Sequence, residues 1–153
     1  MNNDQHYLQR AVELARCNVE QGGRPFGAVL VRDGQVLAET VNRIHLDQDP
    51  TAHAELLAIR SASRQLGPRL EGCVIYASGQ PCPMCLSAMY LCGVSRAVFA
   101  AANEQAEAFG LSTAALYAEL ALPLSEQRLP VEHLPQAAMA GIYQDWKARH
   151  DPQ

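Results

Sequence analysis

Two short stretches, His53-Ala54-Glu55 and Pro81-Cys82-Pro83-Met84-Cys85, decide how this chain folds and what it binds. Imidazole nitrogens and thiolates are donors that Zn²⁺ prefers, and two cysteines three residues apart can reach one ion from a single turn. His53, Cys82 and Cys85 therefore predict a zinc site with three protein ligands. A structural site closes its tetrahedron with a fourth protein ligand, whereas a catalytic site leaves that position to water or substrate.

Three other residues are candidates for a fourth ligand: Cys73, Cys92 and His45. If the chain from Cys85 onward is helical, Cys92 lies about 10 Å from Cys85, which is too far to share one ion. Cys73 opens an extended run and starts well before the turn that holds the other two cysteines. His45 precedes His53 by a proline-containing loop, so the sequence leaves its distance open. We expect the three-ligand site, with one position open.

Glu55 stands two residues after the predicted histidine ligand and has no apolar or helix-pairing role that its neighbours predict. Zinc lowers the pKa of a bound water to about 7, and a nearby carboxylate can take that proton and deliver it to a leaving nitrogen. We therefore predict that Glu55 is the general acid/base and not a ligand. Such a site hydrolyses amidine-like C–NH₂ groups and releases ammonia.

The pattern His-x-Glu followed by Pro-Cys-x-x-Cys is the signature of zinc nucleobase deaminases. The chain resembles the cytidine-deaminase-like superfamily, in the branch that contains bacterial guanine deaminases and tRNA adenosine deaminases. The similarity extends from about Leu8 to Leu120 and includes Pro25 to Val29, Asn42 and Asp49 to Glu55. It implies a three-layer α/β/α fold with a mixed five-stranded sheet, Zn²⁺ as cofactor, and a free nucleobase or related aminated heterocycle as substrate.

The same resemblance implies which residues surround that substrate. In the family, the Pro-Phe-Gly segment and the Asn after the second strand line the base-binding pocket, which assigns Phe26 and Asn42. Backbone N–H groups near Ala54 and Cys82 would hold an oxygen of the substrate during the reaction. Aromatic tails of related deaminases cover the pocket, sometimes from a partner subunit, which makes Trp146 a lid residue.

One segment departs from the guanine deaminases. Guanine deaminases have a segment similar to Gly-Phe-Asp-Asp before the late helix, and an aspartate of that segment engages the substrate. At the matching position this chain has Gly110-Leu111-Ser112-Thr113. No other acidic residue falls on the matching position. The sequence therefore predicts deamination and leaves the identity of the base open, with another aminated azaheterocycle as an alternative to guanine.

Hydrophobic periodicity and turn residues predict an alternation of helices and strands. Helices are expected at about 4–20, 52–65 and 84–92, and strands at 27–31, 36–41, 73–77 and 96–101. A weaker helical stretch at 106–120 is interrupted at Gly110, 131–134 is a fifth strand or a loop, and 135–149 is a final helix. Asp49 and Thr51 are the expected N-caps of the second helix, which would put His53 in its first turn.

Length and composition limit the remaining possibilities. A chain of 153 residues fits a single domain, 1–153, in which 135–150 forms a C-terminal helix that covers the pocket or a subunit interface. The net charge of −4 and the scattered arginines make nucleic acid an unexpected partner. Five cysteines without a secretory leader favour the cytoplasm, and no apolar run approaches the roughly 18 residues of a membrane span. By the family's habit we expect a homodimer.

Two alternatives remain. A tRNA adenosine deaminase would share Asn42-Arg43 and Asp49 to Glu55, but it needs a surface that binds RNA, which an acidic chain provides poorly. A non-catalytic zinc domain, in which the metal only holds the fold, would leave Glu55 without a function.

Overall fold

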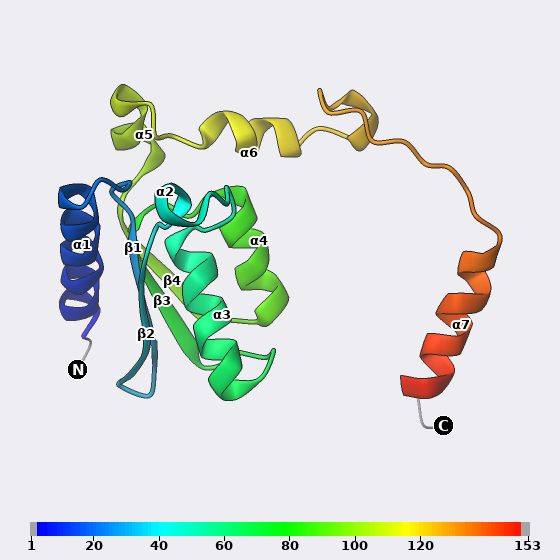
Figure 1. Ribbon diagram of the computed structural model, residues 1–153, viewed down its shortest axis with the longest axis horizontal. Helices are drawn as coiled ribbons and strands as arrows, with labels where there is room; N and C mark the ends of the chain where they lie inside the picture. Colours follow the sequence, from blue (N-terminus) through cyan, green and yellow to red (C-terminus); the bar gives the residue numbers. More distant parts are fainter. Residues whose placement is uncertain (1–2, 151–153) are drawn as a thin grey trace. The chain divides into compact units, whose positions relative to one another are not determined.

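The computed structural model describes residues 3–150 and divides into two compact units, the first ending at Ala118 and the second beginning at Glu119. The first unit is a three-layer α/β/α arrangement (Figure 1). Its sheet consists of β1 (Gly27–Arg32), β2 (Gln35–Val41), β3 (Cys73–Gly79) and β4 (Arg96–Ala101), in the order β2-β1-β3-β4. β1 pairs antiparallel with β2 and β3, and β3 pairs parallel with β4, so the sheet is mixed as expected.

The sheet has four strands, so the expected fifth strand is wrong. Residues 131–134 form an irregular segment of the second unit. The segment is flanked by Pro130 and Pro135, which have no backbone N–H to contribute to a ladder. The missing fifth strand does not change the order or pairing of the other four, because all of them lie in the first unit.

Helix α1 (Asp4–Glu20) covers one face of the sheet, while α3 (Ala54–Leu66) and α4 (Pro83–Cys92) cover the other (Figure 1). Successive side chains of a strand point to opposite faces, so β1 contributes to both cores. Val29 packs in the cluster beneath α1, and Leu30 packs in the larger cluster beneath α3 and α4. Both side chains are completely buried, as expected for a central strand.

The hairpin between β1 and β2 turns at Asp33-Gly34, as the sequence predicts. Both residues have positive φ, 51° and 76°, which is the backbone of a two-residue type I′ turn. This turn lies at the end of the sheet opposite Gly27 and Val41, which are paired at the other end of the hairpin.

Helix α3 begins two residues later than predicted. Asp49 Oδ1 accepts hydrogen bonds from the backbone N–H and the hydroxyl of Thr51, so these residues close a turn of their own instead of capping the helix. His53 is the N-cap residue, with an extended backbone (φ −82°, ψ 149°). The expectation that His53 lies in the first turn is therefore wrong. A short helix, α2 (Ile44–Asp47), precedes this turn.

The chain after β4 folds in short pieces, and Gly110, with φ 72°, ends the one that spans residues 107–109. These pieces are α5 (Asn103–Ala106), the 3₁₀ helix η1 (Glu107–Phe109) and α6 (Ala114–Leu120). The second unit contains the 3₁₀ helix η2 (Leu124–Glu126) and α7 (Ala138–His150). Within residues 3–150, none of the helices is both long and apolar enough to cross a bilayer.

Gly27 allows α1 to lie close against the start of β1. A Cβ at this position would meet the Ala11 carbonyl oxygen at 2.5 Å and the Leu14 Cβ at 2.8 Å. Two backbone elements would have to separate to make room, and this is a larger adjustment than a side-chain rotation. Phe26, which is a predicted pocket residue, directly precedes Gly27.

We predict that Gly27→Ala lowers the free energy of unfolding of the first unit by about 1–3 kcal/mol, the usual cost of overpacking. Gly141→Ala is the matched control, because a Cβ at Gly141 meets nothing within 4 Å. In α7 this change should be neutral or slightly stabilising. Urea denaturation of both variants measures the difference, and equal stability of the two would contradict the packing argument.

Candidate metal centre and adjoining pocket

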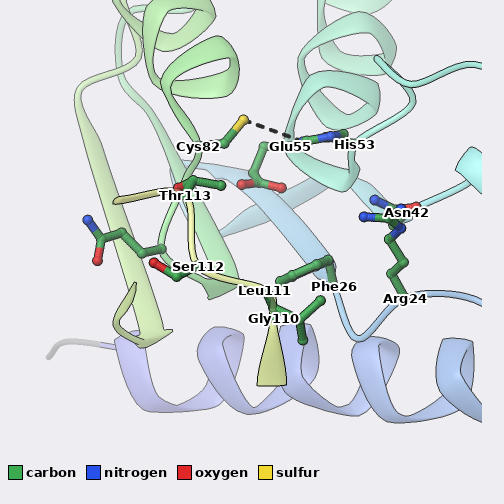
Figure 2. Close-up of a pocket in the computed structure, with 11 residues that line it drawn as sticks. Arg24, Phe26, Asn42, His53, Glu55, Cys82, Gly110, Leu111, Ser112 and Thr113 are labelled. Carbon is green, nitrogen blue, oxygen red and sulfur yellow. Dashed lines mark hydrogen bonds between the residues drawn. The ribbon is translucent and has the colours of Figure 1, made fainter. Parts of the chain in front are cut away.

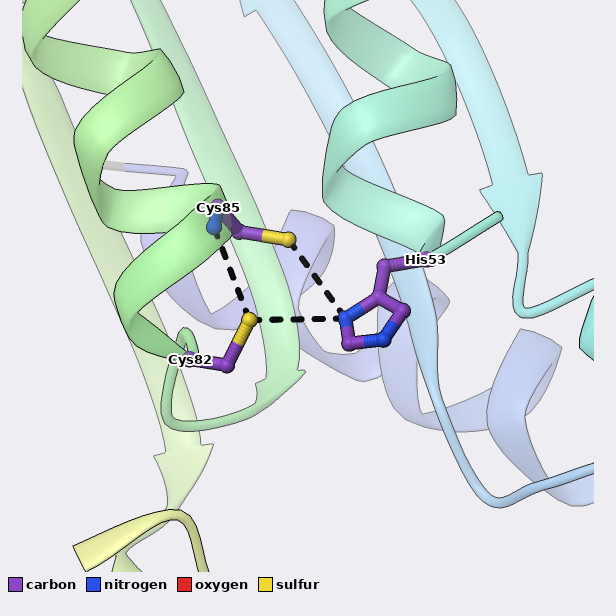
Figure 3. A group of neighbouring side chains, drawn as sticks. All are labelled: His53, Cys82 and Cys85. Carbon is purple, nitrogen blue, oxygen red and sulfur yellow. Dashed lines mark hydrogen bonds between the residues drawn. The ribbon is translucent and has the colours of Figure 1, made fainter. Parts of the chain in front are cut away.

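The three predicted zinc ligands lie together at the starts of two helices. His53 is the N-cap residue of α3, Cys82 is the N-cap residue of α4, and Cys85 lies in the first turn of α4 (Figure 3). Pro83 occupies the first position of α4, where no backbone N–H is needed. These positions are reached because β2 leads toward α3 and β3 leads directly into the Cys82 turn.

The donor atoms have the spacing of a tetrahedral zinc site. His53 Nδ1 lies 3.5 Å from Cys82 Sγ and 3.6 Å from Cys85 Sγ. Zinc bonds of about 2.3 Å to sulfur and about 2.0–2.1 Å to nitrogen, at tetrahedral angles, separate these donors by about 3.6 Å. His53, Cys82 and Cys85 therefore form a group that fits Zn²⁺ in both chemistry and geometry.

No fourth protein ligand joins this group among residues 3–150. Cys92 lies at the far end of α4, where its Sγ contacts the Met89 carbonyl at 3.6 Å. Cys73 is buried at the start of β3, and His45, whose distance the sequence left open, lies on α2 outside the donor group. Three protein donors with one position open is the arrangement of catalytic zinc sites.

The two thiols are electrostatically distinct. The pKa of the Cys82 thiol falls to about 4, because the Cys85 side chain, His53 and the Cys85 backbone N–H all donate hydrogen bonds to it. The Cys85 N to Cys82 Sγ distance is 3.5 Å. The pKa of Cys85 is raised, because its proton is the one that Cys82 accepts and because its side chain is buried. The pKa of His53 is raised, mainly by its hydrogen bond to Cys82.

Glu55 is a buried carboxyl beside the donor group, with 7% of its surface exposed. Burial raises its pKa to about 7, with a smaller contribution from the negative charge of Cys82. The Glu55 side chain lies next to Cys82 and His53, and its carboxyl points into the adjoining pocket (Figure 2). A carboxyl with a pKa near neutrality can both accept and donate a proton at the pH of the cell, as general acid/base work requires.

The site opens into a pocket of about 180 Å³. Its walls come from the segment before β1, the end of β2, the starts of α3 and α4 and the loop before α6 (Figure 2). The lining residues are Arg24, Phe26, Asn42, His53, Glu55, Gln80, Cys82, Gly110, Leu111, Ser112 and Thr113. A pocket well below the roughly 300–1,000 Å³ of drug-sized sites suits a small, flat ligand.

Most of the predicted site residues meet in this pocket. Phe26 and Asn42 line it together with His53, Glu55 and Cys82. Ala54 is fully buried next to His53 but does not line the pocket, and its carbonyl accepts a 2.6 Å hydrogen bond from Thr40. Trp146 belongs to the second unit, where its ring stacks on His150 at 4.5 Å.

Arg24 and Gln80 also line the pocket, although neither belongs to a motif that predicted the site. Arg24 directly precedes the Pro-Phe-Gly segment, and Gln80 directly precedes Pro81, so adjacency to the two recognised motifs was the available signal. Ser112 and Thr113 were noted as a departure from guanine deaminases, and the structure places both in the pocket wall. The loop that carries the departure therefore faces the candidate substrate position.

Comparison with known proteins gives a consistent picture. The family described as the cytidine and deoxycytidylate deaminase zinc-binding region matches residues 1–101. The chain is 39% identical to the guanine deaminase of Bacillus subtilis over 147 residues, which is 95% of this chain and 94% of that protein. An X-ray structure of guanine deaminase from Bacillus subtilis is similar with a TM-score of 0.89, covering 96% of this chain and 94% of that one.

A second group of relatives matches a shorter part of the chain. The tRNA-specific adenosine deaminase of Aquifex aeolicus is 36% identical over 102 residues, which is 66% of this chain and 68% of that protein. The similarity to guanine deaminase covers 95% of the chain and so includes most of the second unit.

We predict that the purified protein binds about one zinc ion per chain and that Cys85→Ser reduces this to a small fraction, because a hydroxyl is a far poorer zinc donor than a thiolate. Cys17→Ser is the matched control, since Cys17 lies on α1 outside the donor group. Elemental analysis after dialysis measures the zinc content. Full zinc retention by Cys85→Ser would contradict the assigned ligand set.

Proposed function

Because this chain belongs to the cytidine and deoxycytidylate deaminase family, we propose that its pocket hydrolyses the exocyclic C–N bond of a free nucleobase, with guanine as the first candidate. The chain is a zinc-dependent hydrolase of C–N bonds. The observation that carries the proposal is the placement of a buried carboxyl, Glu55, beside a three-donor zinc site in a pocket the size of a base.

The reaction adds water across a C–NH₂ bond and releases ammonia. When bound, zinc supplies a Lewis acid that lowers the pKa of water to about 7. Glu55 accepts the proton that water loses as its oxygen bonds to the ring carbon. Glu55 then returns a proton to the nitrogen that leaves, so the C–N bond breaks with ammonia as the product. Its pKa near 7 supports both transfers at neutral pH.

The starts of α3 and α4 support this chemistry electrostatically. Unpaired N–H groups and the positive end of each helix dipole favour negative charge at Cys82 and at the substrate oxygen that forms. The backbone N–H groups near Ala54 and Cys82 are the proposed donors to that oxygen. Phe26 provides an apolar ring and Asn42 an amide at the pocket wall, as expected for a flat heterocycle with polar edges.

A free base suits this pocket better than a tRNA loop. Its volume of about 180 Å³ leaves little space for a ribose and phosphates. The net charge of −4 opposes phosphate binding, and the tRNA-specific relative matches only 66% of the chain. The tRNA alternative is therefore the weaker one.

The C-terminal unit is proposed to complete the site in a homodimer. Every residue from 131 to 150 is exposed, including Ile142, Tyr143 and Trp146 on α7. Apolar side chains of this size are expected to find a covering surface. In the first unit, Tyr90 and Leu91 on α4 are 80% and 79% exposed, so each unit carries apolar surface for association with a second copy. The free cysteines are consistent with the proposed cytoplasmic location.

We predict that Glu55→Gln retains zinc and fold and that its rate of ammonia release falls by about 10²–10⁴-fold, because an amide cannot carry the proton. The substrates to compare are guanine, adenine, cytosine and isocytosine. Glu71→Gln is the matched control, since Glu71 pairs with Arg69 on the surface. A non-catalytic zinc domain would instead show no ammonia release from any base and no difference between the variants.

We predict that the full chain elutes at twice the mass of one chain and that Trp146→Ala lowers kcat/KM about tenfold or more, through loss of an aromatic cover over the substrate. Arg149→Ala on the same helix is the control, because its side chain only pairs with exposed Asp145. Light scattering and steady-state kinetics measure the two effects. A fully active monomer, or unchanged kinetics for Trp146→Ala, would rule out the proposed lid.

A further inference from the structure

The amide side chains in the pocket wall both present donors to the substrate. Asn42 Oδ1 accepts the backbone N–H of Ile44 at 3.1 Å, and Gln80 Oε1 accepts that of Asn103 at 2.9 Å. Backbone N–H groups can only donate, so these bonds fix which way each amide faces. The NH₂ groups of Asn42 and Gln80 remain for a ligand.

The loop before α6 also contributes a hydrogen-bond donor to the pocket wall. Ser112 Oγ accepts the Ala114 backbone N–H at 3.1 Å, so its hydroxyl proton is available to a ligand. Thr113 directs its hydroxyl at Asn103 Oδ1, which also accepts the Thr113 backbone N–H at 3.1 Å. At the position where the sequence of guanine deaminases has an acidic pair, this loop therefore offers a hydroxyl donor and no carboxylate.

Arg24 adds a positive charge to the pocket lining. Its guanidinium makes no hydrogen bond or ion pair with the rest of residues 3–150, so its donors are unused. Among the lining residues the single carboxyl is Glu55, which the proposed reaction already employs.

The backbone of Arg24 is held at the pocket by a buried side chain of α1. Asn18, which is 4% exposed, donates from Nδ2 to the Arg24 carbonyl at 2.8 Å and to the Asn42 carbonyl at 3.0 Å. One amide therefore ties the two wall segments together. Gly23 permits this, because a Cβ there would lie 2.6 Å from Asn18 Nδ2.

We propose that this pocket selects aminated heterocycles that carry an oxo or anionic oxygen on the edge away from the reacting carbon, and that Arg24 is the residue that reads that oxygen. The inference rests on the proposed function and narrows its substrate class. The Arg24 guanidinium and the Asn42 NH₂ lie next to each other in the pocket wall (Figure 2) and are complementary to carbonyl or oxyanion acceptors, whereas an amino group facing them would meet donors only.

The first experiment compares guanine with 2-aminopurine, which carries the same amino group and lacks the 6-oxo oxygen. The ratio of their kcat/KM values is measured in wild type and in Arg24→Gln, so that intrinsic reactivity cancels. The ratio should fall by about 10- to 100-fold in Arg24→Gln, the range for a lost hydrogen bond to a charged group. Cytosine and 4-aminopyrimidine form the equivalent pair if pyrimidines are the better substrates.

Arg32→Gln is the matched control, because it removes the same charge from the hairpin end of β1, where Arg32 Nε lies 3.9 Å from the exposed Asp33 carboxylate. This control should leave the ratio unchanged, and Arg24→Lys should restore part of it. A ratio that is unchanged in Arg24→Gln, or that falls equally in Arg32→Gln, overturns the proposal.

A second measurement does not depend on turnover. Urate, an oxygen-rich purine anion that has no amino group to lose, should bind the zinc-loaded protein, and Arg24→Gln should weaken binding by about tenfold or more. Calorimetry measures the affinity. If bases are deaminated but urate binding does not depend on Arg24, this inference fails and the proposed function stands. If urate binding depends on Arg24 and no base is deaminated, the proposed function fails instead.

Discussion

The whole site depends on bringing the first residues of two helices to one place. Neither helix supplies a complete ligand set, because His53 belongs to α3 while Cys82 and Cys85 belong to α4. The sheet sets the spacing: β1 pairs with both β2 and β3, and these strands lead toward the two helices. Side-chain bonds then fix the ends, with Thr40 Oγ1 on the Ala54 carbonyl and the Tyr117 hydroxyl on the Pro81 carbonyl.

The same placement explains how the protein holds a buried carboxyl near neutrality. Glu55 is almost fully buried, and burial alone would favour its neutral form. Its position in the first turn of α3 partly compensates, because its own backbone N–H donates a hydrogen bond to the carboxylate and so lowers its pKa. The result is a pKa near 7, poised between the two protonation states that proton transfer needs. A surface carboxylate at the same distance from the metal would remain ionised and donate poorly.

The sequence was informative where one local pattern determines the structure. The His-x-Glu and Cys-x-x-Cys spacings predicted the three donors and Glu55, and the Asp33-Gly34 turn predicted the hairpin. It was misleading where two local solutions compete: Asp49 resembles an N-cap, but its carboxylate bonds to Thr51 and the helix begins at Ala54, with His53 as its N-cap. For Arg24 and Gln80 the sequence offered only their adjacency to the two motifs, because their place in the pocket arises only when segments distant in the chain form one wall.

Helix α1 shows how a scaffold element takes part in recognition without touching a ligand. Its sequence predicts an amphipathic helix and nothing more, and most of its buried side chains are apolar. Asn18 is the exception. A buried amide without hydrogen-bond partners lowers the stability of a protein by about 1–3 kcal/mol. Asn18 finds these partners in the carbonyls of Arg24 and Asn42, one from each wall of the pocket. The helix packs closely on β1 at Gly27, so Asn18 is held within reach of both carbonyls. The backbone of the two wall segments is therefore held in place by a helix that covers the opposite face of the sheet from α3 and α4.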